Sequence, residues 1–259
     1  MIDTHCHLNA DVFKDRVDTI VQAARKLGIT MMFVVGWDEP SSEEAVRLSK
    51  TFPWIKAIIG LHPVDSLPFT PRDLSWIESL AKNNPENVIA IGEIGLDHHW
   101  HKADKERKHQ TDIFLAQIDI ANRLNLPIVI HCRDAYTEIL TTLNTVKTLP
   151  KGLMHCYGGL PEQVPAFLSL GFDLSFGGPI TFKNAHQARE SLKQTPIHRL
   201  HIETDSPYLA PHPHRGKENT PLFLPLVFEQ VQHIHNQSHN ELEEQLNKNV
   251  YDLFHVKTL

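Results

Sequence analysis

The chain begins with residues 1–7, MIDTHCH, in which a short apolar run leads into the pair His5 and His7. Alternate residues of a β-strand point to the same side, so these two imidazoles face one way. Four later apolar runs of strand length end in a similar donor: Glu93 after residues 88–92, His131 after 127–130, His155 after 152–154 and Asp205 after 200–204. We expect each donor at the C-terminal end of a strand, and this repeated placement predicts a metal site on one rim of a parallel barrel.

Strand-like runs alternate with helical patterns along the whole chain. We expect strands near residues 1–6, 30–35, 56–61, 87–93, 127–131, 151–155, 171–175 and 199–204. We expect helices near residues 14–27, 41–51, 71–83, 103–125, 134–147, 161–170, 184–194, 219–236 and 239–254. This alternation predicts an α/β fold, a TIM-type (β/α)8 barrel that forms a single domain over residues 1–259. A doubly wound sheet is the structural alternative, and the extra C-terminal helix after residue 239 is expected on the outside of the barrel.

The bulk composition is that of a globular chain, with 41% hydrophobic and 22% charged residues among 259. A chain of this length buries a core without disulfides or a structural metal. Its formal net charge of −6 excludes a broadly basic surface that coats duplex DNA. The charge remains compatible with an enzyme that grips a few phosphates.

We expect a cytoplasmic protein without membrane segments. No apolar stretch approaches the roughly 18 residues that span a bilayer. The first expected strand starts at residue 2, which leaves no room for a targeting segment. The three cysteines are an odd number without a secretory signal, so a reducing compartment is the simplest one.

The alternation of strand residues also places the neighbours of the donors. Cys6, Cys132 and Cys156 each adjoin a donor histidine, so we expect them to point towards the helices as small buried hydrophobic residues. Asp3 and Glu203 share the inward side with the donors. Because a ligating histidine usually donates its other N–H to a carboxylate or carbonyl, both are expected to orient donors, with an ion pair inside the barrel as the alternative.

The donor set contains imidazoles and carboxylates but no thiolate. It suits Zn²⁺, Mn²⁺, Ni²⁺ or Co²⁺, with Mg²⁺ at a carboxylate-rich half. Six donors exceed the three protein ligands of one tetrahedral catalytic ion. Two ions that share Glu93 would use all six, and one ion with the remaining donors acting on the substrate is the alternative.

The sequence resembles the TatD family of metal-dependent deoxyribonucleases, which are amidohydrolase-type barrels. Seven segments in family order carry the resemblance: residues 3–9 (DTHCHLN), 60–63 (GLHP), 92–97 (GEIGLD), 125–135 (NLPIVIHCRDA), 155–159 (HCYGG), 203–209 (ETDSPYL) and 215–221 (RGKENTP). The resemblance implies that one or two divalent ions, bridged by Glu93, are bound by His5, His7, Glu93, His131, His155 and Asp205. It also implies hydrolysis of phosphodiester bonds in DNA, often from the 3′ end.

The chain departs from the family pattern at three places. Tyr157 and Gly158 stand where the family often has Phe-Ser, and His98 stands where it has Tyr. His201 replaces a residue that is usually apolar. These departures bear on substrate preference and leave the metal donors intact.

Several further side chains are candidates for substrate binding. His62 ends the third expected strand and is expected to donate to a phosphate oxygen, with a satisfied loop histidine as the alternative. Arg215 and Lys217 follow the last strand and are expected to neutralise phosphate charge, with a solvated loop as the alternative. Arg133 is expected to pair with Asp134 or another carboxylate. Three further candidates for the pocket entrance are His98, His99 and His101.

We therefore predict a divalent-metal-dependent hydrolase, most closely a TatD-type deoxyribonuclease whose substrate is DNA, as single strands or ends. The catalytic residues are Asp205, a general base that accepts a proton from water, and Glu93 beside it. The sequence indicates no membrane association and no obligate protein partner. The same site acting on an aminoacyl-tRNA ester, a small lactone or an amide is one alternative, because the barrel supports many chemistries. A metal-dependent nucleic-acid-binding protein without turnover is the other.

Overall fold

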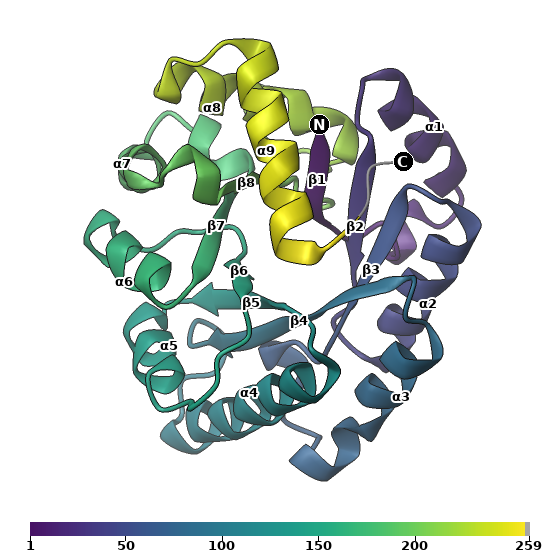
Figure 1. Cartoon of the computed structure of the whole chain (residues 1–259), viewed down its shortest axis with the longest axis vertical. Coiled ribbons are helices and arrows are strands. Elements are labelled where there is room, and N and C mark those ends of the chain that lie inside the picture. Colours follow the sequence, from purple (N-terminus) through teal and green to yellow (C-terminus); the bar gives the residue numbers. More distant parts are fainter. Residues whose placement is uncertain (257–259) are drawn as a thin grey trace.

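The computed structural model describes residues 1–256, which form a parallel barrel (Figure 1). Within that range eight parallel strands follow one another around the sheet in sequence order. They are β1 (Ile2–Cys6), β2 (Met31–Val35), β3 (Ile55–Ile59), β4 (Val88–Asp97), β5 (Ile128–Arg133), β6 (Gly152–Met154), β7 (Phe172–Phe176) and β8 (Leu200–Ile202). The sheet nearly closes where the N–H of Asp205, after β8, donates to the carbonyl of His5 in β1 at 2.9 Å. The predicted TIM-type (β/α)8 fold is confirmed.

Helices alternate with the strands and surround them. They are α1 (Val17–Lys26), α2 (Glu39–Thr51), α3 (Ser75–Asn83), α4 (Asp104–Leu124), α5 (Tyr136–Leu143), α6 (Val164–Ser169), α7 (His186–Gln194), α8 (Leu224–His235) and α9 (His239–Phe254). Helices α3, α6 and α8 start later than expected because Pro71, Pro161 and Pro221 each begin a short 3-10 turn ahead of them. Proline suits such a first position, where its missing N–H would have no partner. Across residues 1–256, none of the helices has the length and apolar character needed to cross a membrane.

Strand residues alternate between two apolar layers. In β2, Met32 and Val34 belong to the layer between the strands and the helices, while Met31, Phe33 and Val35 belong to the layer inside the barrel. This is the period of two that a strand imposes on its side chains. Side chains from several strands fill the interior, so the barrel is a packed core and not a pore.

The pairing of β4 with β5 extends further than expected. β4 continues beyond Glu93 to Asp97, and β5 continues beyond His131 to Arg133. Gly95 in β4 has a φ of 142°, and a Cβ at this position would lie 2.0 Å from the His131 carbonyl oxygen. Only glycine allows this close approach. Glu93 and His131 therefore lie within their strands, which corrects the prediction that each donor closes a strand.

The last helix, α9, lies across the N-terminal mouth of the barrel (Figure 1). Phe254 joins the inner apolar layer, and its ring centroid lies 4.9 Å from that of Phe33. The Asn249 side chain donates to the carbonyls of Ile197 and Leu200 at 2.7 Å, which ties α9 to the start of β8. The helix covers the outside of the barrel, as expected, and the structure places it at the N-terminal mouth. An amphipathic pattern predicts a helix with one apolar face but does not say which apolar surface that face covers.

We expect Phe254→Ala to lower the free energy of unfolding by about 3–5 kcal/mol, the usual cost of emptying a buried phenylalanine site. Phe254 is buried and its ring lies against Phe33 and His201. Urea unfolding measures the change, and Glu244→Ala on the exposed side of α9 is the control. A loss below about 1 kcal/mol, the size of an ordinary substitution, would show that α9 does not close the barrel.

Candidate metal centre

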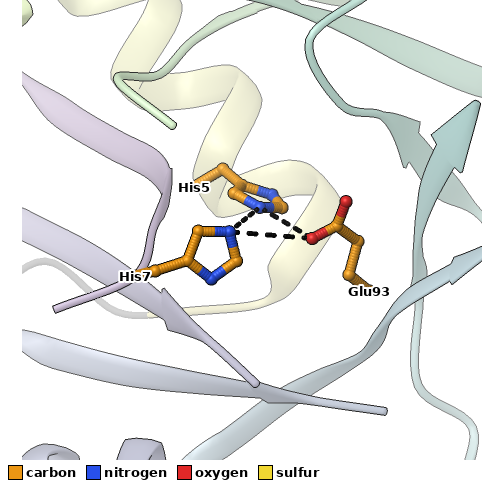
Figure 2. Close-up of side chains that lie close together, drawn as sticks. All are labelled: His5, His7 and Glu93. Atoms are coloured by element: carbon orange, nitrogen blue, oxygen red, sulfur yellow. Dashed lines mark hydrogen bonds and ion pairs between the residues drawn. The ribbon is translucent and has the colours of Figure 1, made fainter. Parts of the chain in front are cut away.

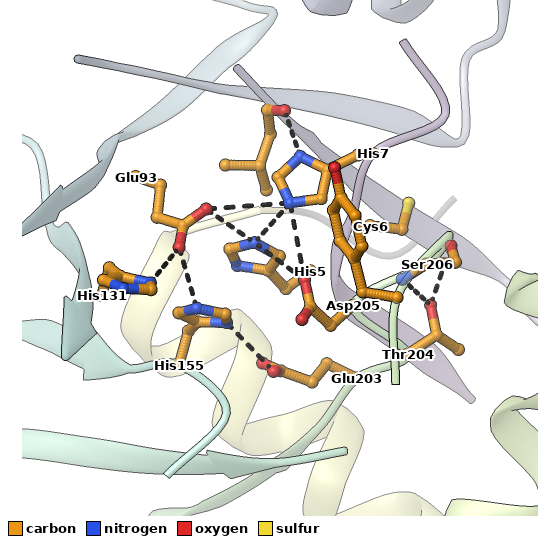
Figure 3. A network of polar contacts seen from close by, with 12 residues as sticks. His5, Cys6, His7, Glu93, His131, His155, Glu203, Thr204, Asp205 and Ser206 are labelled. Atoms are coloured by element: carbon orange, nitrogen blue, oxygen red, sulfur yellow. Dashed lines mark hydrogen bonds and ion pairs between the residues drawn. The ribbon is translucent and has the colours of Figure 1, made fainter. Parts of the chain in front are cut away.

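The structure brings all six predicted donors together at the C-terminal rim of the barrel (Figure 3). The strands themselves supply His5, Glu93 and His131, and the residues after β1, β6 and β8 supply His7, His155 and Asp205. Five of the donors are 0–8% exposed, and His131 is partly buried. Polar groups buried at this density need partners, and ion coordination is one way to provide them.

The first group of donor atoms consists of two imidazole nitrogens and two carboxylate oxygens. His5 Nε2 lies 3.3 Å from both His7 Nε2 and Glu93 Oε2 (Figure 2). Asp205 Oδ1 lies 3.5 Å from His7 Nε2 and 3.8 Å from His5 Nε2. Tetrahedral ligands at the usual bond lengths to Zn²⁺ stand about 3.3–3.6 Å apart. These four donors therefore fit one divalent ion.

The second group of donor atoms faces the other oxygen of the same carboxylate. Glu93 Oε1 lies 2.8 Å from His131 Nδ1, 2.9 Å from His155 Nε2 and 3.5 Å from His62 Nε2. Glu93 Oε2 faces the first group, so its two oxygens serve two sets of imidazoles. Two-metal hydrolytic sites place their ions about 3.5–4 Å apart, a distance that one carboxylate spans. The donors therefore offer places for one or two divalent ions.

Three of the donor histidines are held by acceptors at the ring nitrogen that faces away from the other donors. The pairs are His7 Nδ1 with the Val35 carbonyl at 2.9 Å, His155 Nδ1 with Glu203 at 3.1 Å, and His131 Nε2 with Asp97 at 3.0 Å. Each acceptor favours the tautomer whose opposite nitrogen carries a lone pair. These three donors are therefore oriented for an ion by the surrounding protein.

Glu203 orients a histidine as expected, but Asp3 does not. Asp3 accepts from the backbone N–H of Thr204 at 2.9 Å and from its hydroxyl at 2.6 Å. It also accepts from the backbone N–H of His5, not from the imidazole. Because β8 closes against β1 at this level, the Asp3 carboxylate joins the two strands beneath the site.

Asp97 was missed by the sequence-based search for site residues. Its Oδ2 accepts from His131, and its Oδ1 accepts from the backbone N–H groups of His99 and Trp100 at 3.0 Å. Burial opposes its ionisation, but these hydrogen bonds prevail and lower the pKa of Asp97 to about 2. A signal was present, since Asp97 has the same strand parity as Glu93 once β4 is taken to continue.

The pKa values of the donors suit the binding of a cation. Burial opposes charge on Glu93 and Asp205, yet neighbouring imidazoles hold the pKa of both carboxyls below the usual range. Burial lowers the pKa of His5. Burial acts in the same direction on His155, but the carboxylates around it raise its pKa well above the usual value. Protons and a cation compete for these nitrogens, so metal affinity should fall as the pH falls.

An open cleft of about 790 Å³ leads to the centre. Its lining includes His62 and five of the six donors, together with the aromatic residues Trp37, Trp100 and Tyr208. The volume lies within the range typical of ligand pockets. A substrate can therefore reach buried donors from the rim of the barrel.

The three predicted substrate-binding residues lie at different distances from the centre. His62 is part of it, because its Nε2 lies 3.5 Å from Glu93 while its Nδ1 accepts from the N–H of Val64. Arg215 is exposed and stacks on Phe182, with its guanidinium carbon 4.3 Å from the ring centroid. Lys217 is also exposed. Neither cation lines the cleft among the residues that the structure describes.

Arg133 does line the cleft, and it does not make the ion pair expected for it. Its guanidinium carbon lies 5.8 Å from the centroid of the Trp100 ring, and within residues 1–256 it has no carboxylate partner. Asp134 pairs with His99 instead, at 3.2 Å. Arg133 is the last residue of β5, so its side chain lies at the C-terminal rim of the barrel. None of His98, His99 and His101 lines the cleft within the described chain, whereas Trp100 between them does.

The cysteines follow the expected alternation only where the strand persists. Cys6 points into the outer apolar layer, as predicted, and its thiol donates to the Phe33 carbonyl. Cys132 packs on the same layer but also reaches the cleft, and Cys156 lines the cleft. β6 ends at Met154 and Cys156 has a left-handed φ of 42°, so strand parity does not apply to it. Burial raises the pKa of all three thiols, which keeps them protonated.

A parallel barrel with imidazoles and carboxylates gathered at its open C-terminal rim defines the class of metal-dependent hydrolases. The residues hold donors for one or two divalent ions, whose identity the donor set does not fix. Within that class the chain belongs to the TatD family. The family model described as TatD related DNase matches residues 2–255.

Three known proteins show the extent of the similarity. The protein named uncharacterized metal-dependent hydrolase YabD of Bacillus subtilis (strain 168) is 39% identical over 257 residues, 99% of each chain. The protein named 3′-5′ ssDNA/RNA exonuclease TatD of Salmonella typhimurium (strain LT2) is 33% identical, over 89% of this chain and 90% of its own. The crystal structure of the TatD homologue YjjV from Escherichia coli K12 superposes with a TM-score of 0.92 at 27% identity, over 99% of this chain and 98% of that chain.

Proposed function

We propose that this protein is a divalent-metal-dependent deoxyribonuclease that hydrolyses phosphodiester bonds at single-stranded DNA ends. The observation that carries the proposal is Glu93, whose two carboxylate oxygens face two separate groups of donors at the base of an open cleft. Paired ions are a common solution for phosphodiester hydrolysis, because the attacking and leaving oxygens both develop charge.

The donors divide into two sets in this proposal. One ion would be held by His5, His7 and Asp205, the other by His131 and His155, with Glu93 shared between them. Bound there, the ions would supply Lewis acidity that neutralises phosphoryl charge and makes water more acidic. The chain itself sets the positions of the donors through Asp97, Glu203 and the Val35 carbonyl.

Asp205 is the proposed general base. It lines the cleft while its Oδ1 faces His7 Nε2 at 3.5 Å, so it lies beside the centre and is open to substrate. Burial opposes its ionisation, but the hydrogen bond from His7 and nearby imidazoles keep the pKa of its carboxyl below the usual range. An ionised carboxylate at this position can accept a proton from the attacking water.

Family membership supports DNA over the alternative substrates. The relative from Salmonella is named as an exonuclease on single-stranded DNA and RNA. Of the departures from the family pattern, His201 lies at the opposite end of the barrel against Phe254, and the Tyr157 hydroxyl is engaged with the Leu160 carbonyl. Neither change introduces a new group that competes for the donors.

Arg215 and Lys217 remain our proposed phosphate-binding residues beyond the cleft. Both are exposed on the segment that follows Asp205, so they are free to meet a strand that leaves the cleft. We also propose a reducing compartment, the cytoplasm, because Cys6, Cys132 and Cys156 are free thiols.

The test uses protein stripped of metal with a chelator and reloaded in turn with Zn²⁺, Mn²⁺, Ni²⁺, Co²⁺ or Mg²⁺. We expect stepwise shortening of end-labelled single strands from the 3′ end only after reloading, and slower attack on a duplex of the same sequence. Aminoacyl esters and small lactones are tested on the same preparations. If these compounds are hydrolysed while DNA is left uncleaved, the substrate must be reassigned. Metal-dependent DNA binding without any turnover would favour the non-catalytic alternative.

A further inference from the structure

The cleft exposes aromatic rings more than any other part of residues 1–256 does. Among residues 1–256, Trp100 and Tyr208 are the two most exposed large apolar side chains, at 64% and 59%. Both line the cleft that leads to the metal centre. Exposed apolar surface that gathers at a functional cleft marks a contact surface for a ligand.

Trp100 lies on the His131 side of the centre and is held in place by its backbone. Its N–H donates to Asp97 Oδ1 at 3.0 Å, while Asp97 Oδ2 accepts from His131. The guanidinium of Arg133 lies 5.8 Å from the centroid of the indole ring. One exposed ring with a cation beside it is therefore anchored to the same carboxylate that orients a metal donor.

Tyr208 lies on the other side of the centre, next to His7. The two ring centroids are 5.9 Å apart, and Trp37 approaches His7 from its own loop at 5.5 Å. The backbone of Tyr208 is fixed, since its N–H donates to the Asp205 carbonyl and its own carbonyl accepts from Asn219. Aromatic rings therefore flank the donors on the His7 side and on the His131 side.

The charge of the cleft limits how a polyanion can be held there. Among the described residues that line it, Arg133 is the one arginine or lysine, against the carboxylates of Asp65, Glu93, Asp97, Asp134 and Asp205. Few ion pairs to phosphate can therefore form inside the cleft, so contacts to the bases must contribute to the affinity there.

We propose that Trp100 with Arg133, and Tyr208 across the centre, stack on unpaired bases on either side of the phosphate that is cleaved. The inference rests on the proposed nuclease function and extends it to the mode of substrate recognition. Stacking accepts every base because each has an aromatic face, so the site should tolerate any sequence. Bases inside a duplex already stack on their neighbours, so recognition by these rings would favour single strands.

The experiment combines a protein change with a matching substrate change. Metal-loaded wild type, Trp100→Ala and Trp100→Phe are assayed on a short single strand and on the same strand with an abasic residue beside the scissile phosphate. We expect Trp100→Ala to raise KM for the intact strand roughly 5- to 150-fold, the range found for base–aromatic stacking, and Trp100→Phe to restore most of it. The abasic residue should raise KM of wild type by a similar factor but change KM of Trp100→Ala little, because the missing base and the missing ring remove the same contact.

Two controls separate the possible failures. Leu27 lies at the end of α1, outside the cleft, and is 48% exposed. Leu27→Ala therefore removes an exposed apolar side chain away from the cleft and should leave KM unchanged. The quenching of tryptophan fluorescence by the strand that is lost in Trp100→Ala measures stacking on Trp100 independently of the cleavage rate, because Trp37 also lines the cleft. Equal abasic penalties in wild type and Trp100→Ala, or an unchanged KM in Trp100→Ala, would overturn the stacking site while DNA cleavage by wild type still supported the nuclease. A wild type that neither cleaves the strand nor shows quenching would overturn both.

Discussion

Glu93→Gln is expected to lose at least one bound divalent ion per chain and to reduce DNA hydrolysis by about a thousand-fold or more. Each oxygen of Glu93 faces a different group of donors, at 2.8–2.9 Å for His131 and His155 and at 3.3 Å for His5. An amide removes the negative charge and replaces one oxygen by an NH₂ group that cannot bind an ion. Lewis-acid stabilisation is worth several kcal/mol, and about 1.4 kcal/mol is a factor of ten in rate.

The measurement joins metal analysis and single-turnover cleavage on one preparation. Glu244→Gln makes the same chemical change on the exposed face of α9 and should leave both quantities unaltered. Urea unfolding shows whether the variant retains its fold, because neutralising Glu93 removes the partner of several buried imidazoles. A folded Glu93→Gln protein with two ions and normal cleavage would rule out the shared carboxylate.

The sequence was most informative where chemistry repeats at equivalent positions of a regular fold. An apolar run followed by an imidazole or carboxylate indicates little by itself. When the pattern recurs on five of eight expected strands, the parallel barrel places all of these ends on one rim, because parallel strands point the same way. The pair His5 and His7, which strand parity places on one side, does have its Nε2 atoms 3.3 Å apart.

The sequence was least informative about where strands stop. The extent of β4 depends on its pairing with β5, which Gly95 permits by leaving room for the His131 carbonyl. Asp97 was therefore missed as an acceptor for His131. β6, in contrast, ends earlier than expected, at Met154. Cys156 therefore lies outside the strand and lines the cleft, where strand alternation had placed it towards the helices. Local composition does not encode these limits, because they depend on contacts between distant segments.

Tertiary contacts also decided the partners of individual charges. Arg133 adjoins Asp134 in sequence, yet it lies against the Trp100 ring while Asp134 pairs with His99. Asp134 follows the end of β5 and has a left-handed φ of 55°, so the backbone turns between the two residues, and sequence proximity is a weak guide to ion pairing there. In the same way, α9 covers the barrel mouth because Phe33 and its neighbours leave an apolar surface there.

Asp205→Asn is expected to separate metal binding from catalysis. Asp205 Oδ1 lies 3.5 Å from His7 Nε2 and 3.8 Å from His5 Nε2, so an amide oxygen in its place still faces the first group of donors. The amide cannot accept a proton from water, however, and general-base assistance is typically worth roughly 10²–10⁴-fold in rate. DNA hydrolysis should fall by at least about two orders of magnitude while the variant keeps part of its metal.

This result is distinguished from simple loss of the ion by its response to added metal. Cleavage by Asp205→Asn should stay low when the divalent ion is raised until occupancy matches wild type, because the missing function is proton acceptance. Asp112→Asn, which removes an exposed carboxylate paired with Lys108 on α4, is the matched control and should cleave normally. Recovery of Asp205→Asn to wild-type rates at full occupancy would make Asp205 a metal donor only. The proton acceptor would then be Glu93, which also lines the cleft, or the reaction would need no general base.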